Sequence, residues 1–307
     1  MNKPKVKKVK LSPFVYIIKG IKNYALYDLY NHRLFGVIPE GNIDDLKKQL
    51  LDTGLALETD GVIPFKYEIN IDNYKKHLLI RELQIRITGQ CERNCPDCGE
   101  ICQCFKSTGD MSIEVMHNVI TQFKSIPLTQ VLITGGNPLL RLDIAENMRN
   151  SLSASQFTFL YKCDIENSEL EKIKNKGFEI TSTSPFNREI KRKSLMTKAF
   201  SYFYSQRYNI CWGHKIAIDL DGAIKICLWS EKILGNILKD DIKEMIRKGI
   251  FDEYWNLAKD KITICKECEY RYGCPDCRVQ TFKNTGLYTE KDSCCTYDPK
   301  SGIWLSN

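Results

Sequence analysis

Fourteen cysteines occur among 307 residues, and their spacing is the strongest sign of chemistry in this sequence. Three of them form a C-x3-C-x2-C pattern at Cys91, Cys95 and Cys98. Three thiolates on one short loop can ligate three irons of a [4Fe–4S] cluster, and the fourth iron keeps the exchangeable position that a catalytic centre needs. Zinc is the alternative, with Cys102 or Cys104 as its fourth ligand. The spacing favours iron and sulfur over zinc.

A second group of cysteines lies toward the C-terminus. Cys211 and Cys227 flank Gly222 in the pattern C-x10-G-x4-C. A C-x2-C-x5-C-x2-C run and an adjacent pair follow, and they comprise Cys265, Cys268, Cys274, Cys277, Cys294 and Cys295. Seven thiolates can fully ligate one [4Fe–4S] cluster and hold three irons of a second. A zinc ribbon built on residues 265–277 is the alternative, and it leaves Cys211 and Cys227 unexplained.

The composition is that of an ordinary globular protein, with 43% apolar and 27% charged residues, so disorder, collagen-like repeats and coiled coil are excluded. No stretch approaches the ~18 apolar residues of a membrane span. The lysine-rich segment 1–10 lacks the apolar core of a secretory signal. We therefore expect a cytoplasmic protein without a membrane partner, in which clustered thiols bind metal. The net charge of +7 favours acidic partners, either peptide or nucleic acid.

An alternation of strands and helices must position the first cysteine loop. Strand patterns cover 83–88, 131–134, 157–161 and 178–181, and helix patterns cover 112–125 and 168–177. This alternation predicts a parallel α/β sheet. Cys91 follows the first strand, and the segment Gly135-Gly136-Asn137-Pro138 follows the second. Loops at the carboxyl ends of parallel strands form the crevice where ligands bind, and the glycines let backbone approach a ligand closely.

The regions on either side have a different character. Residues 13–80 contain no cysteine, and strand patterns at 14–18 and 24–27 precede a helix pattern at 43–51. We expect a small α+β domain there. In the C-terminal region an Asp-Gly turn predicts a hairpin over 216–226, helical spacing returns across 239–258, and the cysteine-dense segment follows.

The cysteine loop after the first strand resembles the cluster loop of radical S-adenosylmethionine enzymes. Residues 135–138 are similar to the family's Gly-Gly-Glu-Pro signature near the methionyl amine, with Asn137 in place of glutamate. The resemblance implies that Cys91, Cys95 and Cys98 ligate a [4Fe–4S] cluster. It also implies a 5′-deoxyadenosyl radical that abstracts hydrogen, and S-adenosylmethionine bound by Gly135, Gly136, Asn137 and Pro138. The family barrel has six strands and we count four, so we expect a shortened parallel βα barrel.

The C-terminal cysteines resemble the SPASM auxiliary-cluster domain, which follows the radical core in enzymes that modify ribosomally made peptides. The Asp221-Gly222 turn before Cys227 and the Tyr270-Arg271 pair inside the cysteine run agree with this resemblance. The first auxiliary cluster would take Cys211, Cys227 and Cys277. The second would take Cys265, Cys268, Cys274 and either Cys294 or Cys295, which the sequence does not separate.

The segment Lys19–Leu29, followed by Ile38-Pro39 and the 43–51 helix, resembles the leading segment of the SPASM-domain peptide maturases of grasp-with-spasm systems. This implies a precursor peptide, an ATP-grasp ligase and a low-potential electron donor as partners. We expect a lysine-rich tail at 1–12, an N-terminal α+β recognition domain at 13–80, a radical S-adenosylmethionine core at 81–205, and a SPASM-like domain at 206–307.

The function that these residues favour is therefore an iron–sulfur peptide maturase. One alternative is a non-catalytic iron–sulfur scaffold that presents precursor peptide to the ligase. Another is a radical S-adenosylmethionine enzyme that modifies tRNA, which needs a basic groove with interleaved aromatic residues. The basic segment 3–10 contains no aromatic residue and is typical of a solvated tail, so nucleic acid is the less favoured partner.

Overall fold

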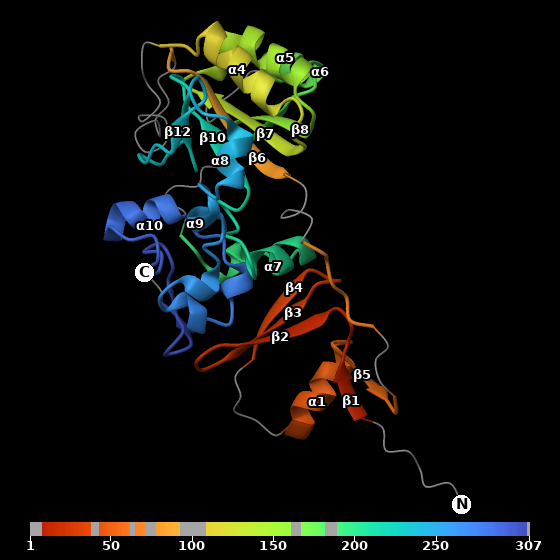
Figure 1. The fold of residues 1–307 in the computed structure, drawn as a ribbon. Coiled ribbons are helices and arrows are strands. Elements are labelled where there is room, and N and C mark those ends of the chain that lie inside the picture. Colours follow the sequence, from red (N-terminus) through yellow and green to blue (C-terminus); the bar gives the residue numbers. More distant parts are fainter. Residues whose placement is uncertain are drawn as a thin grey trace, which may run out of the picture. The chain divides into compact units, whose positions relative to one another are not determined.

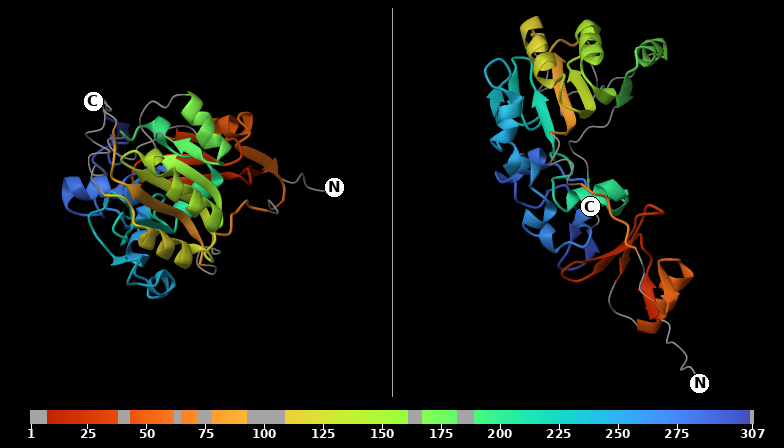
Figure 2. Two further views of the ribbon diagram at one scale, coloured as in Figure 1. Left: turned by 90° about the horizontal axis from the view of Figure 1, so that it is seen from above. Right: turned by 45° about the vertical axis from the view of Figure 1, so that its right-hand side comes forward.

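The computed structural model describes residues 8–37, 43–61, 65–71, 78–92, 109–160, 167–181 and 189–305. The chain divides into two compact units, which are described separately here and are drawn in Figures 1 and 2. Unit 1 combines Met1–Ile71, Glu189–Ile210 and Leu257–Asn307, and unit 2 combines Asp72–Arg188 and Cys211–Asn256. Among the described residues, no helix has the length and apolar character needed to cross a membrane.

Unit 2 is built on a seven-stranded sheet with the order β12-β11-β10-β6-β7-β8-β9. Its strands are β6 (Ile80–Thr88), β7 (Leu128–Gly135), β8 (Ala154–Leu160), β9 (Glu179–Thr181), β10 (Lys215–Ile218), β11 (Ala223–Lys225) and β12 (Gly235–Asn236). The five strands from β10 to β9 run parallel, and β11 and β12 are antiparallel additions. The expected parallel α/β core is thus confirmed. The predicted hairpin over 216–226 extends this same sheet.

The central strand β6 is buried on both faces, as expected for a parallel sheet. The apolar side chains of Leu83, Ile85 and Ile87 share one face and are fully buried. The opposite face carries polar side chains that are buried as well. There Arg86 forms an ion pair with Asp219 after β10, at 3.0 Å between Nη1 and Oδ1. A polar face kept from water needs such partners, because a lone buried charge is costly.

The helices of unit 2 are α4 (Ile113–Phe123), α5 (Leu142–Ser151), α6 (Asn167–Asn175), α8 (Ile242–Arg247) and α9 (Asp252–Trp255), with the short η2 (Pro138–Arg141). Helices α4 and α5 lie over the sheet (Figure 1). Ser112 caps α4 by accepting a hydrogen bond from the Val115 backbone N–H at 3.2 Å. The helical spacing across 239–258 is not one helix. Gly249, with a φ of 72°, separates α8 from α9 because this left-handed conformation ends a helix.

Unit 1 contains an antiparallel sheet of β2 (Val15–Lys19), β3 (Tyr24–Asp28) and β4 (Arg33–Val37). A second pair joins β1 (Lys8–Leu11) to β5 (Ala56–Thr59), beside α1 (Ile43–Asp52). The C-terminal part of the unit has α7 (Ala199–Ser205), α10 (Arg278–Thr285), β13 (Tyr297–Asp298), β14 (Ile303–Trp304) and the short helices η3 (Arg192–Ser194), η4 (Lys259–Lys261), η5 (Cys265–Glu267) and η6 (Arg271–Gly273).

One aromatic core joins the N-terminal sheet to the cysteine-rich C-terminal segment within unit 1. Tyr27 of β3 is fully buried and lies 4.9 Å from Tyr202 of α7, measured between ring centroids. Tyr270 and Tyr297 belong to the same buried cluster, with Cys268 and Cys295 packed against it. The sheet therefore forms part of the support of these two cysteines.

Candidate functional site

The first cysteine loop leaves the sheet at the carboxyl end of β6. Cys91 is half-buried directly after this strand. Cys95, Cys98, Cys102 and Cys104 lie outside the described residues. The described ends of the loop meet, because the Gly89 N–H donates to the Gly109 carbonyl at 2.8 Å. The loop is thus anchored at the edge of the sheet where parallel strands present their ligand-binding groups.

The predicted Gly-Gly-Asn-Pro segment lies against the start of this cysteine loop. The Gly136 N–H donates to the Thr88 carbonyl at 3.0 Å, and the Asn137 N–H donates to the Gln90 carbonyl at 2.7 Å. A Cβ atom on Gly135 would lie 2.4 Å from the Thr88 oxygen, and one on Gly136 would lie 2.3 Å from the Gln90 oxygen. Among the described residues, the atoms that come this close to the two glycines are backbone atoms of residues 88–90. The end of β7 thereby positions the backbone that enters the loop.

Gly136→Ala is expected to lower the free energy of unfolding by about 1–3 kcal/mol, since the added methyl group meets a backbone oxygen that cannot move away alone. Denaturant unfolding monitored by circular dichroism measures this change. Gly109→Ala is the matched control, because no atom of the described residues other than its immediate neighbours lies within 4 Å of a Cβ built there. Equal destabilisation by both substitutions would contradict the assigned packing role.

The buried side chain of Asn137 binds a carboxylate at the start of the cysteine loop. Its Nδ2 donates to Glu92 Oε1 at 2.7 Å, and its Oδ1 accepts from the Leu139 N–H at 3.1 Å, which caps η2. Glu92 is exposed and directly follows Cys91. Glu92 was not predicted from the sequence, although a carboxylate inside the C-x3-C-x2-C pattern was a visible signal. Pro138, the last residue of the predicted segment, is buried at the start of η2.

Two C-terminal cysteines belong to unit 2 and lie around one buried ammonium group. The Lys215 Nζ donates to Cys211 Sγ at 3.6 Å and pairs with Glu82 Oε1 at 3.0 Å. Burial raises the pKa of the Cys227 thiol to about 12, with the charge of Lys215 opposing and that of Cys211 adding to the shift. The structure thus places Cys211 and Cys227 near the same ammonium group. Cys277 belongs to unit 1.

Four other predicted cysteines come together within unit 1. Burial raises the pKa of the Cys268 thiol to about 12, and the nearby thiols of Cys265 and Cys295 add to this effect. Burial also raises the pKa of Cys274, again with contributions from Cys295 and Cys265. These mutual influences indicate that the four thiols lie in one neighbourhood of unit 1. We call Cys265, Cys268, Cys274 and Cys295 the four-thiol group.

The structure distinguishes Cys295 from its neighbour Cys294. The charge of Cys295 contributes to the raised pKa of all three of the other thiols, in which burial is the largest cause. Burial raises the pKa of Cys294, whose other influences are Asp292, Ser293 and the adjacent Cys295. The backbone carbonyl of Cys294 accepts a hydrogen bond from the Ile190 N–H at 2.7 Å. The adjacent residues therefore have different surroundings.

The donor set of the four-thiol group fits an iron–sulfur cluster. All four side chains are half-buried cysteines, and the thiolate form that ligates iron would gain from the buried cations Lys259 and Arg278 beside them. In the part of the chain that the structure describes, no three Cys, His, Asp or Glu side chains converge as the ligands of one metal ion do.

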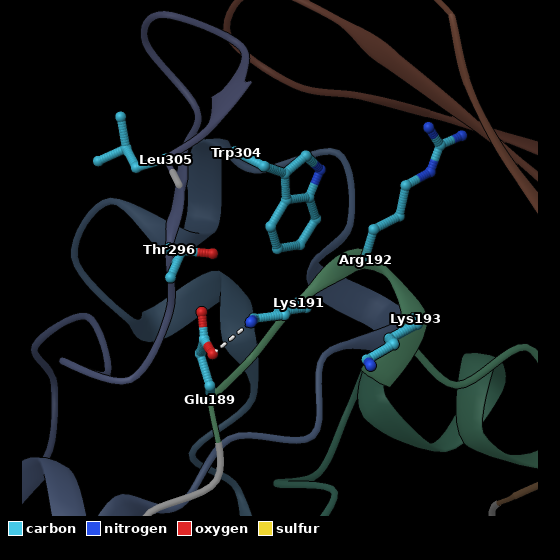
Figure 3. Close-up of a pocket in the computed structure, with 7 residues that line it drawn as sticks. All are labelled: Glu189, Lys191, Arg192, Lys193, Thr296, Trp304 and Leu305. Atoms are coloured by element: carbon cyan, nitrogen blue, oxygen red, sulfur yellow. Dashed lines mark ion pairs between the residues drawn. The ribbon is translucent and has the colours of Figure 1, made fainter. Parts of the chain in front are cut away.

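Unit 1 contains a pocket of about 550 Å³ (Figure 3). It is lined by Glu189, Lys191, Arg192, Lys193, Thr296, Trp304 and Leu305. Figure 3 shows Lys191 reaching toward Glu189, and the two form an ion pair at 2.6 Å. Three cations, one carboxylate and an indole ring can bind an anionic group attached to an apolar one. This pocket was not predictable from the sequence, because its two lining segments are about a hundred residues apart.

No protein-family model matches the chain, and neither does any curated protein. Solved structures similar to it include anSMEcpe with bound AdoMet, with a TM-score of 0.45 and 14% identity over 69% of this chain and 93% of that one. Another is Streptococcus suis SuiB bound to precursor peptide SuiA, with a TM-score of 0.37 and 11% identity over 94% and 100%. BtrN in complex with AdoMet and 2-DOIA has a TM-score of 0.35 and 12% identity over 70% and 98%.

Proposed function

We propose that this protein is a radical S-adenosylmethionine peptide maturase that modifies a ribosomally synthesised precursor peptide. The observation that carries the proposal is the junction of β6 and β7, where the backbone of residues 135–137 lies on the start of the C-x3-C-x2-C loop. This junction lies at the carboxyl edge of a parallel sheet, and it contains the start of the cysteine loop and a polar segment. That edge is where an α/β fold binds its ligands.

Each part of the junction has a proposed role. Cys91, Cys95 and Cys98 hold the [4Fe–4S] cluster, and residues 135–138 bind S-adenosylmethionine. When bound, the cluster and S-adenosylmethionine supply a 5′-deoxyadenosyl radical, which abstracts a hydrogen atom from the peptide. Glu92, held by Asn137, supplies a carboxylate for the methionyl ammonium group. The negative charge that a glutamate at position 137 would have supplied then comes from the neighbouring loop.

Glu92→Gln is expected to weaken S-adenosylmethionine binding by about tenfold or more, because a hydrogen bond to a charged group contributes about 1.5–3 kcal/mol. Equilibrium dialysis of cluster-loaded protein against labelled S-adenosylmethionine measures the dissociation constant. Glu114→Gln makes the same chemical change at an exposed position in the first turn of α4 and should leave binding unchanged. Unchanged binding in Glu92→Gln would remove this carboxylate from the site.

The remaining cysteines are proposed to hold two auxiliary clusters in a SPASM-like arrangement. The four-thiol group fully ligates one of them, and Cys211 and Cys227 supply thiolates to the other. These clusters relay electrons or hold substrate. The proposed partners are the precursor peptide, an ATP-grasp ligase and a low-potential electron donor, which is required because cleavage of S-adenosylmethionine consumes one electron.

Anaerobic purification with iron, sulfide and zinc analysis is the first test of the proposed function. The expected sample is brown, absorbs visible light and carries iron and sulfide for about three clusters. Reduction in the presence of S-adenosylmethionine should yield 5′-deoxyadenosine, and added precursor peptide should change in mass. A colourless preparation that holds only zinc would overturn the proposal.

Two further outcomes separate the alternatives. A protein that holds its clusters and binds precursor peptide but forms no 5′-deoxyadenosine would be the scaffold that presents peptide to the ligase. A gel-shift with total tRNA, set against a precursor-peptide pull-down, tests the tRNA-modifying alternative. We expect retention of the peptide and no shift of the tRNA.

A further inference from the structure

Three buried charged side chains lie beside the four-thiol group. The side chain of Lys259 is 5% exposed, and its Nζ donates to Cys274 Sγ at 3.4 Å. The same ammonium group forms an ion pair with the fully buried carboxylate of Asp276. Arg278, also fully buried, forms a second ion pair with that carboxylate. Asp276 therefore holds two cations in fixed positions next to the sulfur atoms.

The guanidinium group of Arg278 is fixed from its other side as well. Its Nη1 donates to the carbonyls of Tyr288 at 2.8 Å and Glu290 at 2.6 Å. Asp292 also acts on this guanidinium, and its carboxylate accepts from the backbone N–H groups of Cys277 and Cys294, each at 2.9 Å. Arg278 and Asp276 thus form a rigid base for Lys259. Lys259 is the member of this group that contacts sulfur.

A buried ammonium group is costly unless an anion compensates it. Asp276 compensates Lys259 only in part, since Arg278 shares the same carboxylate. The other main charges that act on Lys259 are those of Cys274 and Cys265. A thiolate at Cys274 or Cys265 therefore stabilises the Lys259 ammonium group more than a neutral thiol does. Thiolate is the form in which cysteine ligates iron.

We propose that Lys259 raises the reduction potential of the iron–sulfur cluster held by Cys265, Cys268, Cys274 and Cys295; this rests on the proposed function. Reduction by one electron from a low-potential donor adds negative charge to the cluster and its sulfur ligands. The ammonium group and its N–H donor stabilise that added charge, because hydrogen bonds to cluster sulfurs and local charge set the potential. Lys259 is a positioning residue for electron transfer, since it acts through Cys274 and touches no substrate.

Lys259→Met tests the proposal in the full-length, anaerobically loaded protein. A redox titration followed by electron paramagnetic resonance measures the midpoint potential of each cluster. The signal of the cluster concerned is the one that disappears in Cys268→Ala. We expect its reduced-to-oxidised ratio at fixed potential to fall about tenfold in Lys259→Met, which corresponds to a shift of about 59 mV for one electron.

Lys266→Met is the matched control, since it removes the same charge from an exposed side chain between Cys265 and Cys268. Solvent screens that charge, so its substitution should leave the potential unchanged. If Lys259→Met does not retain this cluster, the titration is done on Lys259→Gln instead. Glutamine keeps an N–H donor and loses only the charge. A shift to lower potential is expected there too.

An unchanged potential in the loaded Lys259 variants would overturn the inference. An equal shift in Lys266→Met would also overturn it, because the effect would then not depend on burial. Failure of the proposed function is distinguishable, since the wild-type protein would then show no cluster signals or no 5′-deoxyadenosine. If the Lys259 variants keep the wild-type iron content and show a lower potential, the result would support both the proposed function and the role of Lys259.

Discussion

Replacing Cys98 with alanine is expected to abolish the formation of 5′-deoxyadenosine and to remove about one cluster of iron from the protein. Under the proposed function, Cys98 supplies the third thiolate of the C-x3-C-x2-C loop. Three thiolates ligate three of the four irons and leave the fourth open to S-adenosylmethionine, and two thiolates cannot do this. Chromatographic assay of 5′-deoxyadenosine in reduced, cluster-loaded protein measures the activity, and colorimetric analysis measures the iron.

Cys104→Ala is the control for this variant, because it makes the same change six residues further along the chain. It should retain both iron and 5′-deoxyadenosine formation. Continued formation of 5′-deoxyadenosine in Cys98→Ala would refute the catalytic assignment of this loop. Loss of bound zinc, rather than iron, in both variants would instead support the zinc site with Cys104 as its fourth ligand.

Cys295→Ala is expected to remove about one cluster of iron, whereas Cys294→Ala is expected to remove none. The reason is that Cys295 acts on the thiols of Cys265, Cys268 and Cys274, while the surroundings of Cys294 are Asp292 and Ser293. Iron and sulfide analysis of the two anaerobically prepared variants measures the difference.

The pair of variants provides its own control, since the two residues are adjacent and the chemical change is identical. Cys268→Ala should reproduce the iron loss of Cys295→Ala, and the C-x3-C-x2-C cluster should stay in place in both. Iron loss in Cys294→Ala alone would reverse the assignment. Unchanged iron in all three variants would indicate spare thiols.

Local sequence patterns predicted the core of unit 2 well. Strand and helix periodicity placed β6, β7, β8 and β9 close to their observed bounds, and Ser112 caps α4 as its residue type suggests. The pairing of β10 with β6 was not predicted, because the two strands are separated by more than a hundred residues. The break at Gly249 was missed because apolar spacing continues across it, although one glycine in a left-handed conformation stops the helix.

The candidate site was predictable to the extent that it depends on cysteine spacing. Spacing identified the cysteines of the four-thiol group, but it could not choose between Cys294 and Cys295, because their surroundings come from distant segments. Glu92 and Lys259 were missed for a related reason. Each acquires its role from a contact across the fold, with Asn137 and with Cys274 respectively. No short pattern encodes such a contact.

The shared aromatic core of unit 1 has a consequence for any attempt to shorten the chain. A protein that begins at Asp72 would leave Tyr202, Tyr270 and Tyr297 without the β3 side chain of Tyr27 that covers them. Water would then reach the scaffold behind Cys268 and Cys295. The sheet of β2, β3 and β4 therefore supports the C-terminal part of unit 1, and a shortened version of this protein has to retain it.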